Sequence, residues 1–510
     1  MAQHQPWYGD RTPQRPVPQN PYAPEGYGTP PPPPRRFRAA PLIAAVLAFL
    51  VLAGVGAYVV VTRDGGDRAA PPAAGPSASP KRTTPPPKTG PPTRAPQHVP
   101  TTEEINAARK PGDARAWVVD DTTDLPRGYN SFEDLWTVGD LVVQAAYRKV
   151  SAYRISDGTE VWSLPLPAPV CETPAHPTPD GKVVLVYKSS QARNGNRCNQ
   201  LQMIDLRAGK AGWHKKLTET GSADDTIIVH TAISGGTLAV VQSLKATAYR
   251  VGDGAKLYDI PMEDPGKCHP VDVAGGVRLL VKSDCALSAS VDRRNYGQIR
   301  EIDPRTGRVR WRFRTEPGWK PGSVFSVDPL VISTGKVENP SENWRVVALG
   351  PDGRARRTID ARAKGFQHCA NTGWGAEFQS CPGVVAGDGM VVLGGIDRVG
   401  GYDLTTGKLL WGVKAGDSDA VLYPLRTEPG KKALVYEAAT WDQPGLVSRL
   451  GPGGVDTRKE VQRHPGSARS TESRMLAGWV VYAHGRLVVT PSGVTGDDGD
   501  HQARMLSFGP

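Results

Sequence analysis

The chain has 510 residues, of which 38% are hydrophobic and 22% charged, with 57 Gly and 48 Pro. That length suits two or three ordinary domains, or one large repeat domain with flanking segments that build no core. The formal net charge is +11, and residues 1–100 carry +7 of it, so the remaining residues are nearly balanced. A balanced main part lacks the broad basic surface of nucleic-acid-binding proteins, and we expect no nucleic acid as a partner.

Residues 1–38 predict a disordered tail. They are rich in proline and include the run Pro30–Pro34, and such a composition offers too little apolar surface to form a core. Arg35, Arg36 and Arg38 directly precede an uncharged segment. Because basic residues beside a membrane span favour the cytoplasmic side, we expect this tail to be cytoplasmic.

Residues 39–62 predict a transmembrane helix. The segment is uncharged, and Leu42–Val61 within it is almost wholly apolar. About 20 such residues form a helix that spans a bilayer core of roughly 30 Å. A cleaved signal peptide is the alternative, but its apolar region is normally about 7–15 residues long and is followed by a small-residue cleavage site. We therefore expect a single-pass anchor in the cell membrane, with the rest of the chain on the extracytoplasmic side.

Residues 63–111 predict an extracytoplasmic stalk. They are rich in Pro, Ser, Thr, Ala and basic residues, a composition typical of an extended, polyproline-like chain. Thr101 and Glu104 have the spacing of a capping box, which predicts a short helix at 102–109 before Pro111. After this helix the pattern indicates strands and turns only.

A segment with a central Gly turn then recurs about every 49 residues. Its copies read ISDGTEVW (155–162), DLRAGKAGW (205–213), RVGDGAKLY (250–258), DPRTGRVRW (303–311), LGPDGRARR (349–357), DLTTGKLLW (403–411) and LGPGGVDTR (450–458). In each copy the turn joins two short strands. A fixed long period combined with strands indicates radial repetition in a β-propeller.

The strands between the turns allow the blades to be counted. Two to three strands precede each turn, which makes four strands per repeat, the usual propeller blade. The stretch 479–510 holds three further strands, and residues 111–119 resemble the turn and last strand of a repeat, with Trp117 in the aromatic position. Pairing these two parts would remove the open edge of the ring. We predict an all-β, eight-bladed propeller at 112–510, closed by its N-terminal strand; seven blades with a C-terminal extension is the alternative.

Four of the six cysteines predict two disulfides. All six follow the predicted membrane span, and an even number in an extracytoplasmic domain favours disulfide bonds. Cys171 and Cys268 lie just before the first strand of their blades, and Cys198 and Cys285 follow the second strand. Because these strands are antiparallel, the pairs Cys171–Cys198 and Cys268–Cys285 come within bonding reach.

The last two cysteines predict a third pair. Cys381 takes the first-strand position of the sixth repeat, and Cys369 in the preceding loop is its nearest candidate partner. Metal binding is the alternative, because histidines lie near several cysteines, but the sequence has no C-x-x-C pair or two-Cys, two-His spacing. We therefore favour Cys369–Cys381.

The clearest copies, GYDLTTGKLLW and REIDPRTGRVRW, resemble the repeats of pyrroloquinoline-quinone-type propellers. That family includes quinoprotein alcohol dehydrogenases and non-enzymatic relatives, such as a propeller lipoprotein of the outer-membrane assembly machinery. The resemblance covers roughly 112–510. It implies that the aromatic residues of the repeat pack blade against blade, namely Trp117, Trp162, Trp213, Tyr258, Trp311 and Trp411.

Enzymatic members, as the resemblance implies, place an adjacent Cys–Cys disulfide over the quinone and hold Ca²⁺ with a Glu/Asn/Asp set. This chain has no adjacent cysteine pair, and it has no G-x-S-x-G, H-E-x-x-H or Walker-type motif. We therefore expect no catalytic, cofactor-binding or metal-binding residues and no cofactor. The expected function is a non-enzymatic binding or scaffold module for another protein of the cell envelope. The alternatives are a quinone-dependent dehydrogenase and a sensor that signals through residues 1–34.

Overall fold

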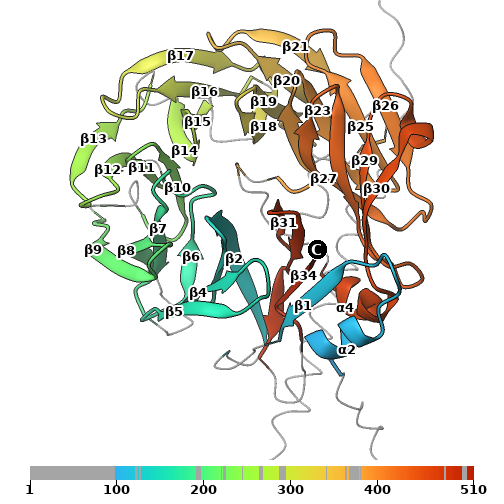
Figure 1. The fold of residues 1–510 in the computed structure, drawn as a ribbon. Coiled ribbons are helices and arrows are strands. Elements are labelled where there is room, and N and C mark those ends of the chain that lie inside the picture. Colours follow the sequence, from blue (N-terminus) through green and yellow to red (C-terminus); the bar gives the residue numbers. More distant parts are fainter. Residues whose placement is uncertain are drawn as a thin grey trace, which may run out of the picture. The chain divides into compact units, whose positions relative to one another are not determined.

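Eight antiparallel sheets stand around a central axis in the computed structural model of the chain (Figure 1). The structure describes residues 98–510 apart from 121–124, 126–127, 191–196, 220, 222–224, 244, 264–267, 286–293, 340–341, 362–364, 367–377, 380, 476–477 and 497–501. The predicted tail, the predicted membrane span and most of the predicted stalk lie outside these residues. Within the described ranges, no helix is both long and apolar enough to cross a membrane.

The first four blades follow one another along the chain, and each is a four-stranded meander. Blade 1 contains β2 (Tyr129–Val138), β3 (Leu141–Ala146), β4 (Lys149–Arg154) and β5 (Glu160–Pro165); blade 2 contains β6 (Val170–Glu172), β7 (Lys182–Lys188), β8 (Cys198–Asp205) and β9 (Lys210–Lys216). Blade 3 contains β10 (Val229–Ser234), β11 (Thr237–Gln242), β12 (Lys245–Arg250) and β13 (Lys256–Ile260); blade 4 contains β14 (Cys268–Ala274), β15 (Leu279–Cys285), β16 (Tyr296–Ile302) and β17 (Val309–Arg314).

The other four blades keep this order, with two short additions. Blade 5 contains β18 (Trp319–Val327), β19 (Leu330–Lys336), β20 (Trp344–Leu349) and β21 (Ala355–Ile359); blade 6 contains β22 (Val384–Gly387), β23 (Met390–Leu393), β25 (Arg398–Asp403) and β26 (Leu409–Lys414). Blade 7 contains β27 (Val421–Glu428), β28 (Lys432–Glu437), β29 (Leu446–Leu450) and β30 (Lys459–Arg463); blade 8 contains β31 (Val480–Ala483), β32 (Arg486–Val489), β34 (Met505–Gly509) and β1 (Arg115–Val119). The additions are β24 (Gly395–Ile396), which pairs with β27, and β33 (Gly493–Thr495), which pairs with β2.

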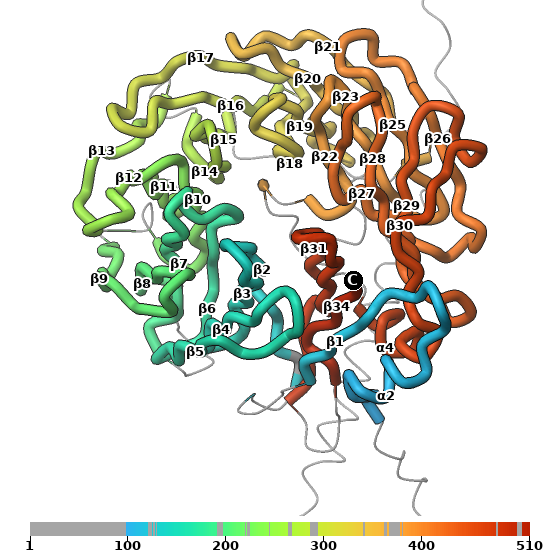
Figure 2. The backbone as a smooth tube through the Cα atoms, viewed as in Figure 1, coloured from blue at the N-terminus to red at the C-terminus, as the bar shows by residue number. Residues whose placement is uncertain are grey.

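The ring is closed by the N-terminal strand, as the sequence predicts. β1 pairs antiparallel with β34, from Arg115 opposite Gly509 to Val119 opposite Met505. Figure 2 shows this blue strand beside the red C-terminal strands. The prediction of eight blades is therefore confirmed, and neither end of the ring is left as an open gap between blades.

A short helix lies beside the closing strand. α2 (Thr102–Ala107) begins with the predicted capping box, in which Thr101 and Glu104 bond reciprocally. The Asn106 side chain donates to the carbonyl oxygen of Ala116 at 2.7 Å and accepts from the Ala116 N–H at 2.9 Å. This side chain thus satisfies two backbone groups of β1 that have no strand on that side.

The expectation of strands and turns only after α2 is wrong in two connections. A 3₁₀ turn, η3 (Gly454–Thr457), lies between β29 and β30, and η4 (Gly466–Ala468) with α4 (Arg469–Glu472) lies between blades 7 and 8. The insertion between these blades contacts α2, since the Ser467 hydroxyl donates to the carbonyl oxygen of Ile105 at 3.0 Å.

The middle strands of each blade form the core because neighbouring blades cover both of their faces. β7 is an example: Val183, Val184, Leu185 and Val186 are all fully buried. Such strands carry continuous apolar runs rather than an alternating pattern.

The repeat aromatics pack between blades, as the family resemblance implies. Each of the first five lies under the Gly turn of the following blade: Trp117 under Gly158, Trp162 under Gly209, Trp213 under Gly254, Tyr258 under Gly307 and Trp311 under Gly353. A Cβ atom on any of these glycines would lie within 3 Å of the ring. The glycines are therefore required both by their positive φ angles and by the close approach of the aromatic ring.

The sixth repeat departs from this pairing. In the fifth copy Arg357 replaces the aromatic residue, lies against Gly407, and donates to the carbonyl oxygen of Thr405 at 3.0 Å. Trp411 of blade 6 packs among residues of blade 7 and donates from its indole N–H to the carbonyl oxygen of Lys431 at 2.8 Å. A cation with a long stem thus takes the place of one aromatic ring.

Two predicted disulfides are present, Cys171–Cys198 and Cys268–Cys285. Their cysteines sit slightly deeper in the strands than expected: Cys171 lies within β6, and Cys198 begins the third strand of its blade rather than following the second. Cys381 is disulfide-bonded. Cys369 lies outside the described residues, so its pairing with Cys381 stays a prediction.

Candidate functional site

The meander of each blade gives the ring two different faces. The turns after the first and third strands share one face, here called the turn face, and the connections between blades lie on the opposite face, here called the connection face. The two disulfides join strand ends at the connection face. Each disulfide crosslinks two strands of one blade and lies away from the groove on the opposite face.

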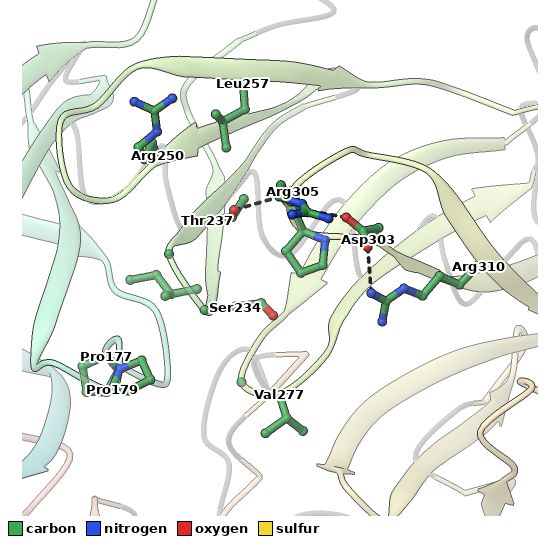
Figure 3. A pocket seen from close by; sticks show the side chains of 15 residues that line it. Pro177, Pro179, Ser234, Thr237, Arg250, Leu257, Val277, Asp303, Arg305 and Arg310 are labelled. Carbon is green, nitrogen blue, oxygen red and sulfur yellow. Dashed lines mark hydrogen bonds and ion pairs between the residues drawn. The ribbon is translucent and has the colours of Figure 1, made fainter.

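A groove of about 1080 Å³ opens on the turn face between blades 2, 3 and 4 (Figure 3). Blade 2 contributes Pro177 and Pro179, and blade 3 contributes the turn at 233–237 together with Arg250 and Leu257. Blade 4 contributes the turn with Val277 and the turn at 303–305. Because three blades supply its walls, no single sequence motif encodes this groove.

The floor consists of two turns in close contact. Gly235, in the β10–β11 turn, has a φ of +58°, as a two-glycine hairpin turn requires. The Gly276 N–H of the blade 4 turn donates to the carbonyl oxygen of Ile233 at 2.8 Å. A Cβ atom on Gly275 would lie 2.2 Å from that same oxygen, so the two turns approach more closely than any larger residue allows.

A residue from the connection between blades 5 and 6 holds this floor. The Gln379 amide accepts from the Gly275 N–H at 2.6 Å and donates to the Gly275 carbonyl oxygen at 2.9 Å. Gln379 belongs to the connection between blades 5 and 6, and the preceding Phe378 is buried in the cluster that contains Ala274 and Leu280. The floor is thus held by a segment that precedes blade 6 in the chain.

The outer wall is fixed by a carboxylate. Asp303 accepts from the Arg310 guanidinium at 2.7 Å and from the Thr306 N–H at 2.9 Å. The hydrogen bond from Arg310, followed by that from Thr306, lowers the pKa of Asp303 to about 2. The carboxylate therefore stays ionised at any pH at which the protein would work, and it holds the turn in one conformation.

Blade 3 supports the same wall from below. The carbonyl oxygen of Pro304 accepts from the Thr237 hydroxyl at 2.9 Å and from the Tyr258 hydroxyl at 2.8 Å. Burial, together with the nearby charge of Asp303, raises the pKa of Tyr258 to about 12, so its phenol remains a donor. Tyr258 is the one predicted aromatic among the described residues that supports this wall.

The surface of the groove combines apolar and cationic groups. Val277 is 73% exposed although it is aliphatic. Arg250 pairs with Asp253 at 2.6 Å, and Arg310 pairs with Asp303 and Glu301. Arg305 forms no ion pair with any residue that the structure describes. The arrangement suits binding of a group that is apolar in part and anionic in part.

The sequence does not predict this groove. The predicted residues are the disulfide cysteines and the repeat aromatics, which stabilise blades, whereas the groove depends on turns from separate repeats. One local signal was available: in Gly275–Gly276–Val277, two glycines present an aliphatic residue at the tip of a turn.

The described residues do not fit the quinone that the family resemblance implies for enzymatic members. The sequence has no adjacent cysteine pair, and the two disulfides described join cysteines with sequence separations of 27 and 17. Phe378 is buried with residues of β14 and β15 of blade 4, and Gln379 bonds to Gly275 of blade 4 and bridges to Val324 of blade 5. Among the described residues, no group of three or more His, Cys, Asp or Glu side chains is placed to hold a metal ion.

The repeats, the closed ring and the blade-to-blade aromatics define an eight-bladed propeller of the pyrroloquinoline-quinone type. A family profile described as outer membrane protein assembly factor BamB matches residues 102–284 and 295–491. The chain therefore belongs to this family of PQQ-like propellers. No curated protein matches the chain.

Two solved structures illustrate the range of similar proteins. The crystal structure of BamB from Moraxella catarrhalis is 15% identical, with a TM-score of 0.43, and the match covers 78% of this chain and 98% of that one. The quinohemoprotein alcohol dehydrogenase ADHIIG from Pseudomonas putida HK5 is 13% identical, with a TM-score of 0.45, and the match covers 78% and 76%.

Proposed function

We propose that the protein is a membrane-anchored, extracytoplasmic binding module that holds another protein of the cell envelope and performs no catalysis. The observation that carries the proposal is the groove on the turn face, which presents exposed aliphatic and arginine side chains beside hydrogen-bonded turns. The membrane anchor rests on the uncharged segment 39–62.

The hydrogen bonds that order the groove support binding. Hydrogen bonds of Gln379, Thr237 and Tyr258 fix its floor and outer wall before any partner arrives. A site that is already ordered loses little conformational entropy on association. A protein surface also matches the composition of the groove, because arginine is enriched and aliphatic groups are common at the centres of protein interfaces.

A photo-crosslinking residue in place of Val277, in the full chain in intact cells, tests the proposal. We expect it to form an adduct with another envelope protein, identified by mass spectrometry. The matched control is the same residue at Ile228, which is 64% exposed but lies on the connection face. The proposal is wrong if position 277 gives no protein adduct, or if both positions give the same adducts in the same yield.

A further inference from the structure

We propose that the groove binds an extended, acidic segment of the partner, in which carboxylates alternate with apolar side chains. This inference rests on the proposed binding function and adds the chemistry of the bound segment.

Three arginines line the groove and offer guanidinium groups to carboxylates. Arg250 stands on one side of the groove and Arg305 and Arg310 on the other (Figure 3). The acidic partner of Arg250 comes from its own turn, and Arg305 forms no ion pair with the described residues. An exposed guanidinium has five donors, so it binds a second carboxylate without leaving the first. Among the residues that line the groove, these three arginines outnumber the one carboxylate, Asp303, so the groove favours an anionic segment.

The inner wall is apolar. Pro177 and Pro179 of blade 2 and Val277 of blade 4 line it, and Leu257 lies across the groove near Arg250. Successive side chains of an extended peptide point in opposite directions. A segment lying along the groove therefore directs one set of side chains to the arginines and the other set to the prolines and Val277, which accounts for the alternation of acidic and apolar residues.

The chain's own stalk does not have this chemistry. Residues 63–97 contain six Lys or Arg and two Asp, a net charge of +4. Like charges placed opposite one another at an interface are destabilising. The occupant is therefore a segment of another protein rather than the N-terminal segment of this one.

The test measures binding of two labelled peptides to the purified full chain in detergent. One peptide of about eight residues alternates Asp with Leu, and the second alternates Lys with Leu; this length matches an extended segment of about 26 Å. We expect fluorescence anisotropy to detect saturable binding of the Asp–Leu peptide only, weakened by added salt.

Charge substitutions locate the binding site. The double variant Arg250→Glu, Arg305→Glu should weaken binding of the Asp–Leu peptide at least about tenfold. If it folds poorly, the double variant Arg250→Gln, Arg305→Gln removes both positive charges without adding negative ones. The control is Arg154→Glu: Arg154 ends β4 of blade 1 as Arg250 ends β12, and the two side chains are 49% and 56% exposed. Arg154 lies outside the groove, so this variant should bind normally.

Three results overturn the inference: no saturable binding of the Asp–Leu peptide, equal binding of the Lys–Leu peptide, or equal loss in the Arg154→Glu control. If the Asp–Leu peptide fails while Val277 still crosslinks to an envelope protein, the binding function stands and only the acidic chemistry is wrong. If Val277 also fails to crosslink, the binding function is wrong as well.

Discussion

Glycine and an aromatic ring form the smallest unit that holds neighbouring blades together. The glycine lies in the turn of one blade, and the ring belongs to the last strand of the blade before it. The sequence predicts both members from their fixed spacing, and the family resemblance supplies their role. It does not predict that Arg357 takes the aromatic position against Gly407, because a charged residue there breaks the pattern on which the prediction depends.

Replacing Gly307 with alanine tests this unit. The added Cβ atom would lie 2.7 Å from the ring of Tyr258, and the residue has a φ of +73°. Backbone strain and overpacking together should lower the free energy of unfolding by about 2–4 kcal/mol. Equilibrium denaturation in urea measures the change.

The matched control is Gly139→Ala. Gly139 also has a positive φ, +62°, but a Cβ atom there meets nothing within 4 Å. This variant should lose only about 1 kcal/mol, from backbone strain alone. Equal losses at the two positions would show that contact with the aromatic ring does not constrain the turn.

At the scale of strands and their connections, the repeat spacing predicts the elements that every blade shares. It does not predict the short strands and the helix that occur in single blades. Four strands per blade and the Cys171–Cys198 and Cys268–Cys285 pairs follow from the repeat. The strands β24 and β33 have two and three residues, too few to show a two-residue period. The helix α4, in the insertion between blades 7 and 8, has four residues. This is too short for an apolar face to show in the sequence.

The disulfide of blade 2 should stabilise the fold through chain entropy. It closes a loop with a sequence separation of 27, so replacing Cys171 and Cys198 together with alanine should lower the free energy of unfolding by about 3 kcal/mol. Urea denaturation without reductant measures the loss. In the same variant, labelling of the denatured, unreduced protein should find no free thiol; a stability unchanged from the parent would contradict the prediction.

For the whole molecule, the predicted closure is what turns eight sheets into a ring. The prediction was possible because the two ends of the repeat region are incomplete in complementary ways. The groove was not predictable by the same reasoning, because it depends on which turns of blades 2, 3 and 4 face one another, and that arrangement has no periodic signature in the sequence.

Removing residues 1–119 should open the ring. Without β1, the backbone groups of β34 from Met505 to Gly509 lose their partners, and an exposed edge strand associates with other chains. We expect a lower midpoint of thermal unfolding and larger species in size-exclusion chromatography than for a chain that lacks only residues 1–97. If the two truncated chains behave alike, β1 does not close the ring in solution.

The closing strand also sets an order of events during folding. β1 is synthesised before all the other strands but pairs with β34, about 390 residues later in the chain, and contacts across so long a loop form late. At a synthesis rate of about 5–20 residues per second, Trp117 and the edge of β1 remain without β34 for roughly 20–80 seconds. In that interval α2, which is adjacent in sequence and bonds to Ala116 through Asn106, is the native neighbour already present. The small N-terminal helix therefore covers one edge of β1, the strand on which ring closure depends, until β34 is synthesised.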